Sequence, residues 1–168
     1  MPFEASAATR PFSCTAGIEL RGSLLVLTYT VSGPLQDLII PAAAIAPGFT
    51  PGLWQGTCCE CFLRQDEVKS YAEWNFSPCG SWWACAFDDY RVPARRQPAA
   101  MQPLELDIQR GKNLLTLTAA LSCQPVPGLR IGPAFILQHA GGSRSHWAIA
   151  HPGATPDFHH AETCSCIL

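Results

Sequence analysis

Aromatic rings and polar groups suited to binding a sugar recur through the middle of the chain and near its end. A sugar ring presents apolar C–H faces and a rim of hydroxyls, so its site needs flat aromatic platforms with carboxylate, amide or guanidinium groups at the edge. The candidate rings are Trp54, Trp74, Trp82, Trp83 and Trp147, and the candidate edge groups are Glu60, Glu73, Asn75, Arg91 and Gln138.

Position along the chain separates these candidates. Trp54 ends a long Pro-rich connection and Trp147 lies in the last predicted hairpin, so each fits a loop-side platform, with core packing as the alternative. Trp74 and Trp83 favour core packing, although Trp82 and Trp83 must point to opposite faces of a strand. Glu60, flanked by two cysteines, lies either on a solvated face or paired within a cavity. Arg91 ends the run D-D-Y-R, which equally fits an ion-paired turn.

Metal, haem and catalytic chemistry have weaker signals. His159, His160, Cys164 and Cys166 are weak candidates for zinc, because the C-x-C spacing chelates less well than the usual C-x₂₋₄-C. Haem would need axial ligands alone, such as Met101 with a histidine, since no C-x-x-C-H motif occurs. We therefore expect no cofactor, with haem and zinc as alternatives. The sequence has no nucleophile elbow, Gly-rich phosphate loop or H-E-x-x-H, so we expect no catalysis.

Composition limits the partners. The chain has 168 residues, which we assign to a single domain with one core. A net charge of -2 gives no broad positive field, so nucleic acid is not an expected partner. No apolar run approaches the ~20 residues needed to span a bilayer, so we expect no membrane association. Glu4 and Arg10 interrupt the segment where an export signal could begin, and the nine cysteines are odd in number. We therefore expect a cytoplasmic protein with mostly reduced thiols.

The elements that must position the candidate residues are strands. Residues 17–32 predict two strands about Gly22 and Ser23, and residues 58–64, 70–76 and 82–87 predict a meander. Residues 104–109 with 113–121, and 134–138 with 146–150, predict two more hairpins. In the run C-C-E-C-F-L, alternation places Cys59 and Cys61 with Leu63 on one face, and Cys58 with Glu60 and Phe62 on the other.

These patterns together predict an all-β fold, an antiparallel β-sandwich with few or no helices. No long amphipathic helical pattern occurs anywhere in the chain. Residues 1–13 have no period and predict either a flexible arm or the start of an edge strand.

Two segments carry a family resemblance. T-C-C-E-C-F-L-R-Q-D-E-V-K-S-Y-A-E-W-N-F-S-P-C-G-S-W-W-A-C-A-F-D-D-Y-R, residues 57–91, resembles the central signature of bacterial DOMON-like domains. S-H-W-A-I-A-H-P-G-A-T-P-D-F-H-H, residues 145–160, resembles the C-terminal signature of the same family. The resemblance implies a jelly-roll-like sandwich related to carbohydrate-binding module family nine and to haem- or sugar-binding DOMON domains. In the sugar-binding branch two aromatic side chains clamp a ring, and the positions that match are Trp54, Glu60 and Trp147.

The sequence therefore predicts a non-catalytic module that binds a small molecule, with a saccharide as the leading class. We expect the ligand against Trp54 and Trp147, with Glu60 or Arg91 at its edge. The alternative is a structural or protein-interaction module in which the same tryptophans are buried in the core or in a homodimer face. Exposure of Trp54 and Trp147 distinguishes the two, because a core tryptophan cannot stack on a ligand.

Overall fold

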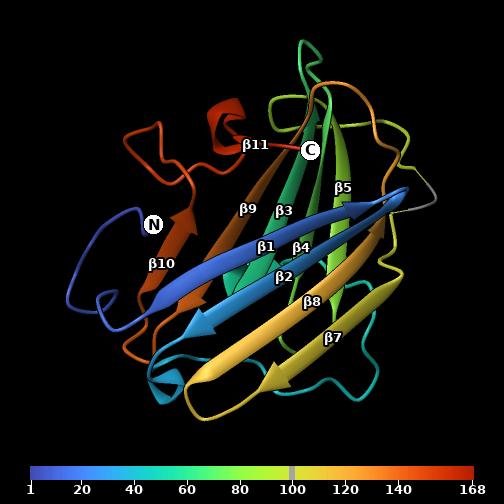
Figure 1. Ribbon diagram of the computed structural model, residues 1–168. Coiled ribbons are helices and arrows are strands. Elements are labelled where there is room, and N and C mark those ends of the chain that lie inside the picture. Colours follow the sequence, from blue (N-terminus) through green and yellow to red (C-terminus); the bar gives the residue numbers. More distant parts are fainter. Residues whose placement is uncertain (99–100) are drawn as a thin grey trace.

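Two antiparallel β-sheets pack face to face in the computed structural model, which describes residues 1–98 and 101–168 (Figure 1). The smaller sheet has the strand order β1-β2-β8-β7, and the larger has the order β10-β9-β3-β4-β5-β6, with β11 also paired to β9. The smaller sheet consists of β1 (Ser13–Arg21), β2 (Leu24–Ser32), β7 (Glu105–Arg110) and β8 (Leu114–Ser122). The larger consists of β3 (Cys58–Gln65), β4 (Tyr71–Phe76), β5 (Trp82–Asp89), β6 (Val92–Pro93), β9 (Leu129–Gln138), β10 (Arg144–Ala148) and β11 (Cys166–Ile167). The predicted antiparallel β-sandwich is confirmed.

Local sequence explains most of the connections. The β1-β2 hairpin turns at Gly22, whose φ of 60° lies in the left-handed region that glycine enters without strain. The meander β3-β4-β5 and the hairpins β7-β8 and β9-β10 also form as predicted. Strand β9 begins five residues earlier than expected and passes through Pro133. Pro133 lies between the part of β9 that pairs with β11 and the part that pairs with β10, where a missing N–H is tolerated.

In the part of the chain that the structure describes, helical structure is limited to three single turns of 3-10 helix. They are η1 (Leu35–Asp37), η2 (Leu53–Gln55) and η3 (Ala161–Thr163). Within residues 1–98 and 101–168, no helix has the length and apolar character needed to cross a bilayer.

The N-terminal residues extend the edge of the larger sheet. The Met1 ammonium donates a 2.7 Å hydrogen bond to the Ala148 carbonyl, and the Phe3 N–H donates one of 2.7 Å to the His146 carbonyl. Pro2 forms an antiparallel bridge with Trp147. The segment expected to be a flexible arm or an edge strand is thus hydrogen-bonded along β10 at its start, and β1 begins at Ser13.

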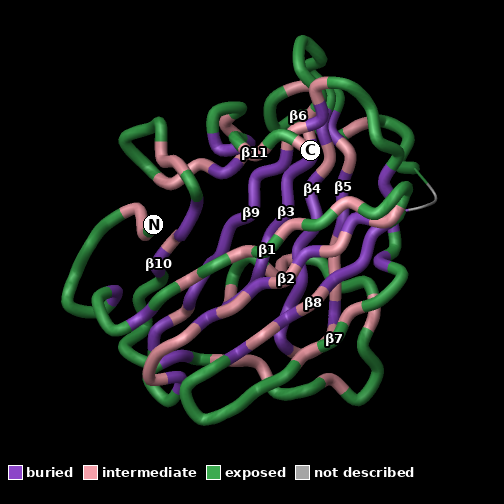
Figure 2. The backbone as a smooth tube through the Cα atoms, in the orientation of Figure 1, coloured by how far each residue is buried: buried purple, intermediate pink, exposed green. Residues whose placement is uncertain are grey.

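Both faces of the larger sheet are buried, which is the feature that creates the site. The main core lies between the sheets and includes Cys59, Cys61 and Leu63 of β3. Cys58 and Phe62, the alternate residues of the same strand, belong to a second apolar cluster on the outer face, as the alternation predicted. Phe158, from the segment after β10, packs over that outer face with its ring 6.5 Å from Phe62. Figure 2 shows that β3 and β9 are buried along most of their length.

Candidate functional site

A pocket of about 380 Å³ lies on the outer face of the larger sheet. Its floor is made by the outward-pointing residues of β3, β4 and β5, and its walls come from η2, the turn after β5 and the segment that follows β10. A volume of this size is typical of sites for small molecules, for which ~300–1,000 Å³ is usual. Residues of β6, β9 and β10 complete the lining, so neighbouring strands of one sheet and the segments beside them build one concave site.

Two tryptophans form an aromatic wall of the pocket. Trp54 lies in η2 and Trp83 on β5, and their rings meet edge to face with centroids 5.1 Å apart and an interplanar angle of 65°. Gly52 precedes η2 with a φ of 83°, a left-handed conformation that lets the chain turn into this single helical turn. Trp54 is 38% exposed, and Trp83 is half-buried. This pair combines a rigid apolar surface with access from solvent.

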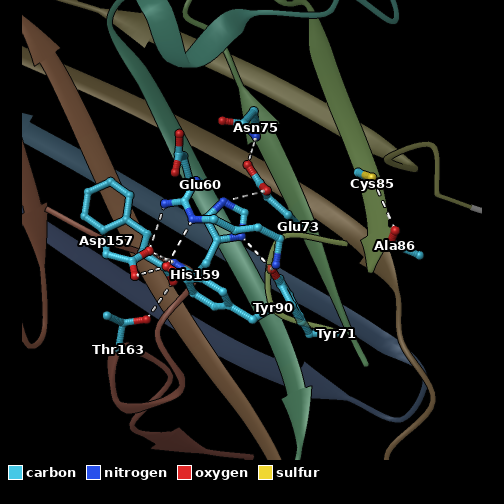
Figure 3. Close-up of polar contacts among 12 residues, drawn as sticks. Glu60, Tyr71, Glu73, Asn75, Cys85, Ala86, Tyr90, Asp157, His159 and Thr163 are labelled. Atoms are coloured by element: carbon cyan, nitrogen blue, oxygen red, sulfur yellow. Dashed lines mark hydrogen bonds and ion pairs between the residues drawn. The ribbon is translucent and has the colours of Figure 1, made fainter. Parts of the chain in front are cut away.

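Two buried carboxyl groups lie on the floor beside these rings. In the β3-β4 register Glu60 is opposite Asn75 and Phe62 is opposite Glu73, so the two glutamates are diagonal neighbours on one face. Glu60 is 3% exposed and Glu73 5%. Asn75 Nδ2 donates a 2.6 Å hydrogen bond to Glu73 Oε1 (Figure 3), and the Cys58 thiol donates a long 3.6 Å one to Glu60 Oε1. Both glutamates are therefore almost entirely shielded from bulk solvent.

The environment raises the pKa of both carboxyl groups. Burial raises the pKa of Glu73 from 4.5 to about 7, although the Asn75 hydrogen bond and the nearby Arg91 oppose the change. Burial also raises the pKa of Glu60 well above its usual value, and the charge of Glu73 raises it further. Two carboxyl groups that share a low-dielectric pocket resist ionising together, so a ligand that supplies donors or positive charge would meet a prepared site.

A hydrogen-bonded chain lines the rim. The Arg91 N–H donates to the Tyr71 hydroxyl over 3.0 Å, and that hydroxyl lies 2.6 Å from His159 Nδ1. Because the Tyr71 oxygen already accepts a hydrogen bond from Arg91, the Tyr71 hydroxyl can donate its own hydrogen bond to Nδ1. Nδ1 is then the unprotonated nitrogen, and the imidazole proton is on Nε2. Nε2 faces Glu73 Oε2 at 3.6 Å. Burial lowers the pKa of His159 to about 4, with the Arg91 charge as the next cause, so this ring is neutral at pH 7.

Arg91 is held at the rim by an ion pair with the segment after β10. Its Nη2 lies 2.9 Å from Asp157 Oδ1, and the Tyr90 hydroxyl donates a 2.7 Å hydrogen bond to Asp157 Oδ2 (Figure 3). Arg91 has a φ of 55°, an uncommon left-handed conformation for a residue with a side chain. These contacts fix the turn after β5 against the segment that carries Phe158 and His159, which closes the pocket on this side.

Three of the four residues predicted from sequence to bind a ligand come together in this pocket. Trp54, Glu60 and Arg91 all line it. Trp147 does not, because its side chain points into the main core, where it is 5% exposed and donates a 2.9 Å hydrogen bond to Ser145 Oγ. Its neighbour His146 points to the pocket instead. A side chain in the core cannot stack on a ligand, so we correct the assignment of Trp147 and remove it from the candidate set.

The candidate ligands for zinc and haem lie in different parts of the fold. His159 lines the pocket, whereas His160 Nδ1 accepts a hydrogen bond from the Glu162 N–H at the start of η3. Cys164 is buried in the outer-face cluster, and Cys166 lies on β11. Within the described part of the chain, no three His, Cys, Asp or Glu side chains gather as metal ligands. Met101 packs in the main core, on the other side of the sheet from His146. All nine cysteines are free thiols.

Sequence reasoning did not select several residues of the pocket. Trp83 was expected in the core, and His159 was considered as a weak metal ligand but not as a residue that contacts a small-molecule ligand. Phe62 and Phe158 were not considered as ligand-contacting residues, although both line the pocket. Alternation along β5 puts Trp83 on the face of Cys85 and Phe87, but which face that is depends on the register of β5 against β4.

Comparisons with known proteins give the fold a context. No family model and no curated protein sequence matches this chain, so its DOMON-like resemblance stays a prediction. Among solved structures, the chain is similar to a protein from Bacteroides uniformis ATCC 8492 provisionally described as carbohydrate-binding, with a TM-score of 0.63 and 14% identity over 96% of this chain and 82% of that one. It is also similar to a carbohydrate-binding module of family 9 from Caldicellulosiruptor kristjanssonii in complex with cellotriose, with a TM-score of 0.55 and 10% identity over 88% of this chain and 68% of that one. At such identities these likenesses show a shared β-sandwich fold.

Proposed function

We propose that this protein is a non-catalytic binding module and that its outer-face pocket holds a saccharide. In this proposal Trp54 and Trp83 contact the apolar faces of the sugar, while Glu60 and Glu73 accept hydrogen bonds from its hydroxyls. The observation that carries the proposal is the pairing of an accessible aromatic wall with buried carboxyl groups in one pocket of about 380 Å³. That combination matches a ligand with apolar faces and a polar rim.

Hydrogen-bonding capacity on the pocket floor supports the proposal. An ionised carboxylate offers about four acceptor positions. Within residues 1–98 and 101–168, the carboxyl group of Glu60 accepts a hydrogen bond only from the weak thiol donor of Cys58, at 3.6 Å. Burying a carboxyl group with so few donors is costly, and sugar hydroxyls are donors of the right size to reduce that cost. The carbohydrate-binding descriptions of the two similar structures add support at the level of the fold.

Truncating the aromatic wall is expected to weaken binding. Trp54→Ala and Trp83→Ala should each lower the affinity for the saccharide about tenfold or more, because each removes a large rigid contact surface from the site. Isothermal titration calorimetry against a panel of gluco-, galacto- and manno-oligosaccharides measures this effect.

Phe49→Ala is the matched control for these two variants. Its ring is 56% exposed and packs edge to face on Trp82, which lies on the opposite face of β5 from Trp83. The control should bind as the wild type does. Equal affinity in all four proteins would show that the saccharide binds elsewhere, and a panel without any saturable binding would reject the proposal.

A protein-interaction module is the second candidate, and one observation favours it. The connection between η1 and β3 exposes Ile39, Ile45 and Phe49 in addition to Trp54. Exposed apolar side chains gathered on one segment are typical of contact surfaces. Sedimentation equilibrium from micromolar to millimolar protein tests the simplest form of this idea, a homodimer, which would raise the average mass with concentration.

A further inference from the structure

We propose that the pocket prefers a saccharide that carries a protonated amino group, and that the ammonium is held by the carboxylates of Glu60 and Glu73. This inference rests on the proposed function and names the class of sugar that the same pocket takes. Three observations carry it: the charges in the pocket, the burial of the two glutamates and the aromatic wall next to them.

The pocket contains two acidic groups without a matching cation. Within the described residues, neither Glu60 nor Glu73 forms an ion pair with a lysine or an arginine. Arg91 is near enough to lower the pKa of both carboxyl groups, but its guanidinium is ion-paired with Asp157 at 2.9 Å. The one basic ring facing Glu73, that of His159, is neutral at pH 7. An incoming ammonium would therefore supply the positive charge that the floor lacks.

Burial strengthens the attraction between the ammonium of the ligand and the two carboxylates. Glu60 and Glu73 are only 3% and 5% exposed, so their attraction to a cation is weakly screened by water. A hydrogen bond between an ammonium and a carboxylate is about twice as strong as one between neutral groups, so an amino group gains more here than the hydroxyl it replaces. Burial also makes it costly to ionise the two carboxyl groups in the empty pocket, and a bound cation reduces that cost.

The walls are suited to the same ligand. Trp54 and Trp83 present aromatic surface beside the carboxyl groups, and Phe62 and Phe87 line the pocket as well. Aromatic faces attract cations, most strongly where water is excluded. A neutral sugar would use these rings only as apolar platforms, whereas an amino sugar can use both their apolar surface and their negative faces.

The amine preference is expected to depend on pH. Raising the pH from 5 to 7 increases the ionised fraction of Glu73, whose pKa is raised to about 7 by burial, while a sugar ammonium stays largely protonated. The affinity for an amino sugar should therefore increase over this range. The other titratable groups that face the carboxyls or line the pocket are Cys58 on β3, Tyr71 on β4, Cys85 on β5, Arg91 after β5, His146 on β10, and Asp157 and His159 after β10.

Matched pairs of sugars test the inference on the wild-type protein. Glucosamine, galactosamine and mannosamine are each titrated at pH 7 against glucose, galactose and mannose, and against the three N-acetyl derivatives, in which the nitrogen is uncharged. The amino sugar of the bound stereochemistry should bind about tenfold or more tightly than its neutral and N-acetylated partners. Tighter binding at pH 7 than at pH 5 should accompany it.

Two variants and a control then locate the preference. Glu60→Gln and Glu73→Gln keep the size of the side chain and remove its charge, and each should shrink the ratio between amino and neutral sugar. Glu105→Gln changes an exposed glutamate on β7 of the other sheet and should leave the ratio as in the wild type. Saturable binding of a neutral sugar without an amine preference would overturn this inference and leave the proposed function intact. The absence of saturable binding for every sugar of the set and of the oligosaccharide panel would overturn both this inference and the proposed function.

Discussion

Replacing Trp147 by alanine is expected to lower the free energy of unfolding by about 3–5 kcal/mol, the usual cost of removing a large aromatic side chain from a core. Trp147 is 5% exposed and packs between the two sheets. Its indole N–H also donates to Ser145 Oγ, which lies 2.8 Å from His139 Nε2, so the substitution removes a buried hydrogen bond as well. Urea denaturation followed by far-ultraviolet circular dichroism measures the loss.

The loss of stability in the Trp147 variant is to be compared with that in Trp54→Ala. Trp54 is 38% exposed and belongs to the pocket wall, so we expect its truncation to change stability by about 1 kcal/mol or less. The two tryptophans were predicted from sequence to form one site, and the structure gives them different roles. Similar losses of stability in the two variants would contradict these roles.

Replacing Glu73 by glutamine is expected to raise the free energy of unfolding above that of the wild type, and this difference should be larger at pH 8 than at pH 4. The native pKa of Glu73 is about 7 and its ordinary value is 4.5, so between these pH values the native state holds a proton that the unfolded state has released. Wild-type stability therefore falls as the pH rises through this window. Because each pKa unit corresponds to about 1.4 kcal/mol, the loss is about 3 kcal/mol by pH 8. The neutral amide avoids it.

Chemical denaturation of both proteins at pH 4, 6 and 8 gives this pH dependence directly. Subtracting the wild type from the variant removes the contributions of groups that titrate alike in both. Glu105→Gln serves as the control, because its exposed side chain stays in water in the native and unfolded states alike. A difference between Glu73→Gln and wild type that does not change with pH would contradict the burial of an ionisable Glu73 in the pocket.

Local patterns in the sequence were sufficient to predict most of the strands and the faces of β3. Alternation in C-C-E-C-F-L assigns Cys59 and Cys61 to one face and Glu60 to the other, and the structure confirms this division. Turn residues such as Gly22 mark the hairpins because only a few residue types adopt their backbone conformation without strain. The sandwich follows from such local rules.

The composition of the pocket depends on relations between strands that no single segment encodes. Trp83 lies beside Glu73 and Glu60 only because of the registers of β4 with its two neighbours. A shift of one residue reverses the face of every side chain, so no pattern within one strand decides whether Trp147 or its neighbour His146 faces the pocket. Phe158 and His159 reach the pocket through an irregular segment after β10, whose path over the sheet has no periodic signal.

The measurement that tests the central claim most directly is a nuclear magnetic resonance titration of the five tryptophan indole N–H signals with the bound saccharide. Each signal is assigned from a single Trp→Phe variant. The structure predicts that saturating ligand shifts the signals of Trp54 and Trp83, which line the pocket, and leaves Trp74 and Trp147, which lie in the main core, nearly unchanged. Saturable binding that leaves Trp54 and Trp83 unperturbed would contradict the account.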